Sequence, residues 1–110
     1  MGERTRSLRP FWFTTTPSKA GDSYYFMVPA FAIHNKYIYV DREYKVYFEE
    51  TEKIDDIHSV TLDEIEGFLN FKSKPAKSGT NYRFTIPAFL VKNNYIAPED
   101  KREYWIFVVE

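Results

Sequence analysis

Apolar and polar residues alternate in a short stretch near the C-terminal end of the chain. Tyr82, Phe84 and Ile86 alternate with polar residues, which is the period of a half-buried β-strand. The same unit occurs earlier, where residues 24–28 precede another proline. In both places the strand is followed by Pro-Ala-Phe, and proline at the first position of a helix loses no hydrogen bond. The pattern therefore predicts two copies of a strand that leads directly into a short helix.

These two copies belong to a longer internal duplication. Residues 19–38 align without a gap to residues 77–96, at a constant offset of 58 positions. Arg-Glu-Tyr at 42–44 returns at 102–104 with an offset of 60, so the second copy has two extra residues in the intervening turn. Each copy reads as strand, turn, strand, short helix, turn and strand. Such self-similarity indicates a repeat architecture.

The boundaries of the predicted elements follow from the apolar periods and the turn residues. In the first copy we predict a turn at 17–22 and a helix at 29–35, and in the second copy Asn93-Asn94 supplies a left-handed residue that ends the helix. The apolar run at 103–109 suits a strand that is buried on both faces. The other predicted strands are at 11–15, 24–28, 44–48 and 68–72.

The organisation predicted for the 110 residues is a single domain. Repeat one covers 9–50, an acidic linker with a short helix covers 51–66, and repeat two covers 67–110. Thr61 and Glu64 have the spacing of a capping box at the start of the linker helix, with Gly67 as its stop. About 40 residues are close to the minimum that folds alone, so we expect the two repeats to share one core.

Aromatic residues recur at matched positions of the two repeats. Because they follow the inward period of the predicted elements, we interpret them as core residues and not as residues that stack on nucleic-acid bases. The matched pairs are Tyr24 and Tyr82, Phe26 and Phe84, Phe31 and Phe89, and Tyr37 and Tyr95.

Charge is distributed unevenly along the chain. The net charge is −1, but residues 49–66 hold eight acidic residues and one lysine, a net of −7, which leaves +6 for the rest. Residues 67–92 hold five basic residues and no acidic one. The small net charge of the whole chain therefore conceals one basic and one acidic region.

The sequence shows no pattern that would support catalysis. It contains no cysteine, and the two histidines, His34 and His58, have no catalytic or metal-binding motif around them. A glycine-rich phosphate-binding loop is also missing. We therefore predict that the protein is not an enzyme and uses neither a cofactor nor a metal.

A family resemblance follows from the duplicated unit. In repeat two Lys-x-Gly is followed by a strand, Ile-Pro, a short helix with Val-Lys and a last strand, and in both repeats a glycine stands eight residues before the proline. This order resembles the SpoVT/AbrB superfamily of transition-state regulators and MazE-type antitoxins. The resemblance implies a mainly β fold with short helices, a tandem swapped-hairpin (AbrB-like) β-barrel with pseudo-twofold symmetry. It also implies a small transcriptional regulator that binds double-stranded DNA as an intramolecular pseudo-dimer.

The basic residues of that family are only partly reproduced here. The two arginines that follow the proline in the regulators fall on Ile33 and His34 in repeat one and on Val91 and Lys92 in repeat two. The arginine four residues before the proline falls on Tyr25 and Arg83. Both repeats have tyrosine where family members usually have glycine, so the helix must end differently. An asymmetric site, or a preference led by DNA shape, is expected from this difference between repeats.

The predicted DNA-contacting residues are the basic positions of both repeats and of the N-terminal segment, with one tyrosine and one histidine. They are Lys72, Lys74, Lys77, Arg83, Lys92, Lys19, Tyr25, His34, Arg4, Arg6 and Arg9.

Other partners stay open at this point. The runner-up function is a protein-interaction module, antitoxin-like or scaffold-like, that binds a protein partner through the acidic connector at 49–66. That connector also fits a solvated loop, or a strip that keeps DNA away from the far side. Single-stranded nucleic acid and a homodimer of pseudo-dimers are further alternatives.

Location follows from composition. No run of about 18 apolar residues exists, so we expect no contact with a membrane. The absence of cysteine and of an apolar signal-like segment suits a cytoplasmic protein, which would be nucleoid-associated if it binds DNA.

Overall fold

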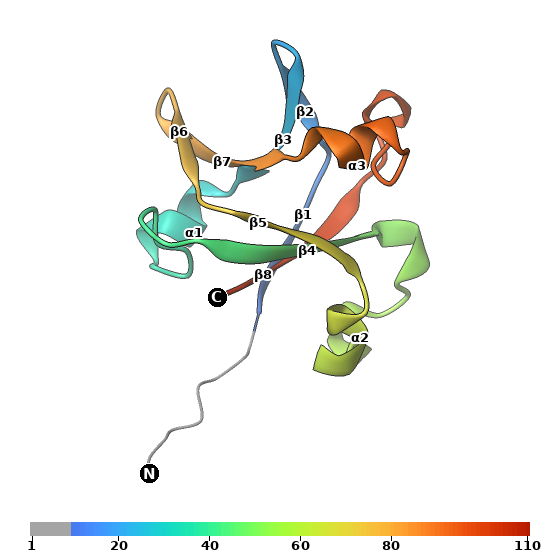
Figure 1. Cartoon of the computed structure of the whole chain (residues 1–110). Coiled ribbons are helices and arrows are strands. Elements are labelled where there is room, and N and C mark those ends of the chain that lie inside the picture. The colour runs from blue at the N-terminus through green and yellow to red at the C-terminus, as the bar shows by residue number, and fades with distance from the viewer. Residues whose placement is uncertain (1–9) are drawn as a thin grey trace.

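The computed structural model describes residues 10–110, which form two antiparallel sheets connected by short helices (Figure 1). With 41% strand and 24% helix, the fold is mainly β, as predicted. The strands are β1 (Phe11–Thr15), β2 (Ser18–Ala20), β3 (Ser23–Val28), β4 (Tyr44–Glu50), β5 (Leu69–Ser73), β6 (Ala76–Ser78), β7 (Asn81–Ile86) and β8 (Tyr104–Val109). The helices are α1 (Ala30–His34), α2 (Leu62–Glu66) and α3 (Ala88–Lys92), with 3₁₀ turns at Thr51–Lys53, Ile57–Ser59 and Pro98–Asp100.

The two repeats interlock in both sheets. Sheet A has the strand order β1-β8-β4-β5 and sheet B the order β2-β3-β7-β6. In sheet A the first strand of each repeat pairs with the last strand of the other, β1 with β8 and β5 with β4. In sheet B, β3 pairs with β7, so that Phe26 lies opposite its equivalent Phe84. A pseudo-twofold axis therefore passes through the middle of both sheets.

The closed barrel implied by the family resemblance is not seen. The strands form two separate four-stranded sheets, and each repeat passes from sheet A to sheet B at a buried proline, Pro17 or Pro75. Proline has no backbone N–H to donate to a ladder, so hydrogen bonding is interrupted at this corner. Three-residue strands, β2 and β6, follow the corners where a turn was predicted.

The main core lies between the two sheets and contains residues of both repeats. Phe26 and Phe84 are fully buried there, as predicted, and Tyr24 and Tyr82 pack against it while partly buried. The prediction for the other two aromatic pairs is wrong, because their exposed fractions lie between 50% and 57%. Helices of five residues bury only one position each, Ala32 or Leu90, and the neighbouring phenylalanine points away. The exposed aromatics are Phe31, Phe89, Tyr37 and Tyr95.

The acidic connector builds a second, smaller core on the outer face of sheet A. Ile65 of α2 is buried with Tyr47 and Phe107, and two isoleucines and one valine of the connector pack around them. The capping box of Thr61 and Glu64 is present, which confirms the predicted helix start, and Gly67 is the C-cap. Because β8 lies between the two cores, it is buried on both faces as its apolar sequence predicted.

The helix ends in both repeats use a left-handed residue. Asn94 has φ of 64°, as the Asn93-Asn94 pair predicted, and the equivalent Lys36 has φ of 62°. The proline before each helix is the N-cap and not the first helical residue. The extended backbone angles of the proline suit the N-cap position. The proline lacks a backbone N–H, but no strand hydrogen bond is lost, because the N–H of an N-cap residue is not needed for the β-sheet ladder.

Two kinds of polar contact, a tyrosine hydrogen bond and an ion pair, occur at equivalent positions of both repeats. The hydroxyl of Tyr44 accepts a hydrogen bond from the backbone N–H of Tyr39 at 2.8 Å, and Tyr104 accepts one from Ala97 at 3.2 Å. Burial is the main cause that raises the pKa of both tyrosines. Two ion pairs at matched positions cross between the repeats, Arg42 with Glu110 at 2.6 Å and Arg102 with Glu50 at 2.7 Å.

Candidate nucleic-acid interface

Two equivalent hairpins, β2–β3 and β6–β7, project from one end of the molecule (Figure 1). Each has a two-residue turn, Gly21-Asp22 or Gly79-Thr80, in which only the glycine has a positive φ, 61° or 64°. A positive φ at the first central residue is the requirement of a type II′ turn, which matches the twist of the strands. The glycines therefore fix the direction in which the hairpins project.

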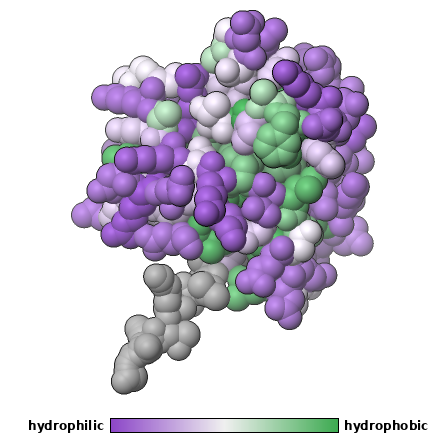
Figure 2. Space-filling view, in the orientation of Figure 1, coloured by the Kyte–Doolittle hydropathy of each residue, from purple (hydrophilic) through white to green (hydrophobic). Residues whose placement is uncertain are grey.

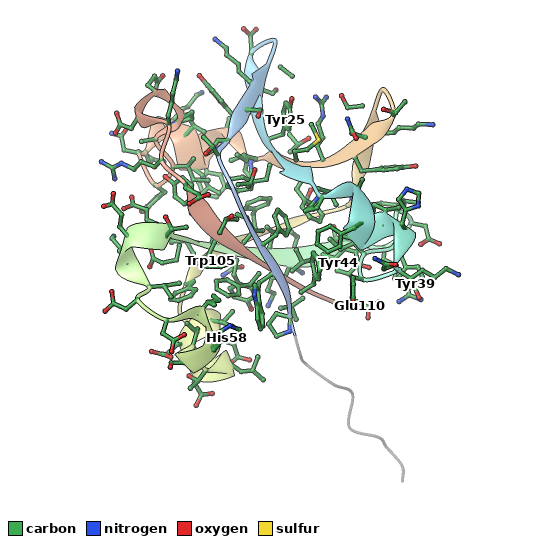
Figure 3. The ribbon with its side chains drawn as sticks, turned by 180° about the vertical axis from the view of Figure 1, so that it is seen from behind. Tyr25, Tyr39, Tyr44, His58, Trp105 and Glu110 are labelled. Carbon is green, nitrogen blue, oxygen red and sulfur yellow. The ribbon has the colours of Figure 1, made fainter. Side chains whose placement is uncertain are left out.

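The outer face of sheet B lies between the roots of these hairpins. Tyr25 and Arg83 occupy equivalent positions of the two repeats and meet there, with the guanidinium carbon 4.7 Å from the centre of the tyrosine ring. Figure 3 shows Tyr25 on its hairpin, far from His58 in the connector. The Nε of Arg83 is buried and has no hydrogen-bond partner within the described residues. Two arginines at these positions would repel each other, whereas arginine and tyrosine attract.

The outer side of the hairpins is made of small residues. The strand registers place these residues level with Tyr25 and Arg83, on the face that points away from the core. Small side chains allow a large ligand to approach the backbone closely. The residues are Ser18, Ala20, Ser23, Ala76, Ser78 and Asn81.

The lysines of the hairpins lie on the opposite side of the ribbons. Lys19 pairs with Tyr24, and the equivalent Lys77 pairs with Tyr82, so both start from the inner side. The Nζ of Lys19 lies 5.9 Å from the centre of the Tyr24 ring. Both lysines are exposed near the tips, which hydrophilic side chains cover in Figure 2.

Sheet B and the short helices that follow it form a basic half of the molecule. We define the hairpin half as residues 17–40 and 74–97, which contain six basic residues and one acid, Asp22, a net of +5. The rest of the described chain has a net of −8, because it contains fourteen acids and six bases. The charge difference seen along the sequence is therefore a difference between the two ends of the fold.

The helix residues of the predicted set face the hairpin of the other repeat. Lys92 lines a cavity of about 410 Å³ with Asp22 and Tyr24, and His34 lines the equivalent cavity of about 170 Å³ with Thr80 and Tyr82. Lys92 consequently has an acidic neighbour at the hairpin tip, which His34 lacks.

The structure does not bring all predicted residues together. Lys72 lies on sheet A, opposite Lys45, and Lys74 lies at the corner between the sheets. The predicted Arg4, Arg6 and Arg9 lie outside the described residues. Sequence reasoning missed that Tyr25 and Arg83 touch each other, although their equivalence under the 58-residue offset was available as a signal.

The part of the chain that the structure describes holds neither a metal site nor a membrane-spanning helix. Within residues 10–110, no three histidine, aspartate or glutamate side chains gather to hold a metal ion. None of the helices described by the structure is long and apolar enough to cross a membrane. No family model, curated protein or solved structure matches this chain.

Proposed function

We propose that this protein binds double-stranded DNA as a small transcriptional regulator and that the two repeats act as an intramolecular pseudo-dimer. The proposal rests on one observation. Two equivalent hairpins project from a half of the molecule that has a net charge of +5, while most acids lie at the other end. Positive charge supplies the main attraction to a duplex, and it steers the duplex toward the hairpins.

The hairpins have the shape that a DNA groove admits. A two-stranded β-ribbon fits the major groove, and its small outer residues allow close approach. Lys19 and Lys77 start from the inner side of the ribbons and are exposed near the tips, from which their long side chains would extend toward the flanking phosphates. The pseudo-twofold axis between β3 and β7 matches the local pseudo-twofold symmetry of a duplex.

The swapped-hairpin architecture of the SpoVT/AbrB superfamily is part of the same proposal. In support of it, the first strand of each repeat pairs with the last strand of the other repeat. The duplicated Gly-to-Pro spacing supports it as well. The two open sheets would then be a divergent form of that architecture.

The test is fluorescence anisotropy with a labelled mixed-sequence duplex at about 50 and 200 mM salt. We expect micromolar or tighter binding at low salt that weakens at least tenfold at high salt, as contact with several phosphates requires. Lys77→Glu with Arg83→Glu should nearly abolish binding. Because Arg83 is half-buried against Tyr25, Lys19→Glu with Lys77→Glu is the cleaner pair.

The matched control reverses two exposed lysines away from the hairpins, Lys53→Glu with Lys101→Glu, and changes the net charge by the same amount. It should retain most of the affinity, and both this control and the Lys19 and Lys77 pair should keep the wild-type Tm. Absence of binding at low salt, or equal loss in both pairs, would refute a site at the hairpins.

A further inference from the structure

The two repeats differ at a pair of matched positions beside the exposed aromatic residues. In repeat one the ring of Phe11 stacks on Tyr37, with centroids 5.0 Å apart and an interplanar angle of 15°. The same ring meets Phe31 edge-on at 5.7 Å. The rings of Phe11, Phe31 and Tyr37 therefore pack together in repeat one.

Repeat two has Leu69 in place of Phe11, and the corresponding space is open. Leu69 is 45% exposed and Tyr95, the equivalent of Tyr37, is 50% exposed. A hollow of about 240 Å³ lies between them, with Phe48 and Tyr104 also in its wall. A leucine has no aromatic ring, so within the described residues no ring stacks on the face of Tyr95, although Tyr95 as a whole is no more exposed than Tyr37, at 57%. Figure 2 shows a hydrophobic area over α3 and β5 framed by hydrophilic residues.

The hollow also differs in charge from its counterpart. Glu49, Glu50 and Lys53 lie at its edge. Beside Tyr37 the position that matches Glu49 is Val109, and Glu110, which matches Glu50, is paired with Arg42 at 2.6 Å, so that place holds one carboxylate fewer. Glu50 is already paired with Arg102 at 2.7 Å, whereas Glu49 accepts a hydrogen bond from the backbone N–H of Glu50 at 2.9 Å and has no ion-pair partner within the described residues.

A second hollow of about 290 Å³ shares Glu49 and Lys53 with the first. Apolar side chains also line it, Ile54 and Val60 of the connector and Phe68 just after it. Further carboxylates line it as well, and we call the two adjoining hollows the acidic strip. Its five carboxylates and one lysine are Glu49, Glu50, Asp55, Asp56, Glu64 and Lys53.

We propose that the acidic strip binds a basic segment of a protein partner. An arginine or lysine of that segment would place its methylene stem between Leu69 and Tyr95, with its cation toward the tyrosine face and Glu49. Apolar walls with acidic edges are complementary to long basic side chains, which carry a charge at the end of an apolar stem. The same charges repel nucleic acid, and no residue of either hairpin lines the two hollows, so this surface is separate from the hairpins.

The decisive variant is Leu69→Phe, which closes the hollow with the residue that repeat one already uses. The matched control is Leu62→Phe, a similar exposed leucine on α2 that does not line either hollow. The probe is a fluorescein-labelled twelve-residue peptide of repeating Arg-Leu-Ser-Gly, compared with the same peptide containing glutamate for arginine. Anisotropy measures affinity, and NMR shifts of Tyr95 report contact with the hollow.

We expect the arginine peptide to bind and the glutamate peptide not to bind. Leu69→Phe should weaken binding at least tenfold, Glu49→Gln about threefold, and Leu62→Phe less than twofold, with the Tm unchanged in each. Equal affinity of the wild type and Leu69→Phe would overturn the proposal, as would equal binding of both peptides. A mass well above 13.1 kDa in light scattering that Leu69→Phe reduces would show that a second copy occupies the strip, and would equally overturn it.

Discussion

Replacing Lys19 and Lys77 together by alanine tests how the hairpins would hold a duplex. The log–log dependence of DNA affinity on salt has a slope of about −0.9 per phosphate neutralised. If Lys19, Lys74, Lys77 and Arg83 each neutralise one phosphate, the expected slope is about −3.6, or about 150-fold weaker binding between 50 and 200 mM salt. Removing two of these contacts should change the slope to about −1.8, or about 12-fold over the same range.

The measurement is a series of anisotropy titrations at five salt concentrations for the wild type and the double variant. Lys53→Ala with Lys101→Ala is the control, and its slope should equal that of the wild type. A double variant whose slope stays within about 0.5 of the wild type would show that the hairpin lysines do not contact phosphate, whatever its affinity. The hairpin orientation of the proposed complex would then be wrong.

The hairpins are also expected to contribute unequally. Asp22 lies in the turn after Lys19, whereas the equivalent position after Lys77 is Thr80. A carboxylate near the contact repels phosphate, so Lys77→Ala alone should cost more affinity than Lys19→Ala alone. Equal losses in the two single variants would contradict this electrostatic argument.

The remaining predictions concern stability. Tyr44→Phe leaves the N–H of Tyr39 without its acceptor and should lower the free energy of unfolding, measured in urea, by about 1 kcal/mol. Tyr104→Phe should lower it by less, because the hydrogen bond to Tyr104 is longer. A larger loss of stability in Tyr104→Phe would contradict this ranking. Because the pKa of both hydroxyls is raised in the folded state, the folded protein holds these protons more tightly than the unfolded chain. Their contribution to stability is complete below about pH 10 and is lost as the pH rises further. Urea titrations at pH 8 and above pH 10 should show that loss in the wild type and a smaller one in the double phenylalanine variant. Lys36→Gly should raise the free energy of unfolding by about 1 kcal/mol, because a left-handed conformation is costly for lysine; Asn35→Gly, at a residue with φ of −93°, should not.

Much of the local structure follows from neighbouring residues and was accessible to sequence reasoning. The capping box at Thr61 and the left-handed Asn94 depend on contacts within a few positions, and the strand from Phe11 to Thr15 could be placed from its aromatic and β-branched residues. The aromatic residues of the short helices could not be placed in this way. With five residues, α1 and α3 have a single buried position each, and whether Phe31 or its neighbour Ala32 fills it depends on how the helix meets the sheets.

The candidate site was predictable in its charge and unpredictable in its geometry. Counting charges located the basic and acidic regions, because composition is a property of the sequence. The register of β3 and β7 decided that Tyr25 meets Arg83 and that the hairpin lysines start from the other side of the ribbons. A shift of one residue in that register would reverse every one of these positions.

By itself the sequence determined the duplication, the type of most elements and the separation of charge, since each depends on residue identity and short spacings. Only the tertiary structure decided which strands pair, because the first strand of each repeat finds its partner in the other repeat, far along the chain. It also decided that the sheets stay open at Pro17 and Pro75. The hollow beside Leu69 has the same origin, because a missing ring matters only where the fold places a tyrosine against it.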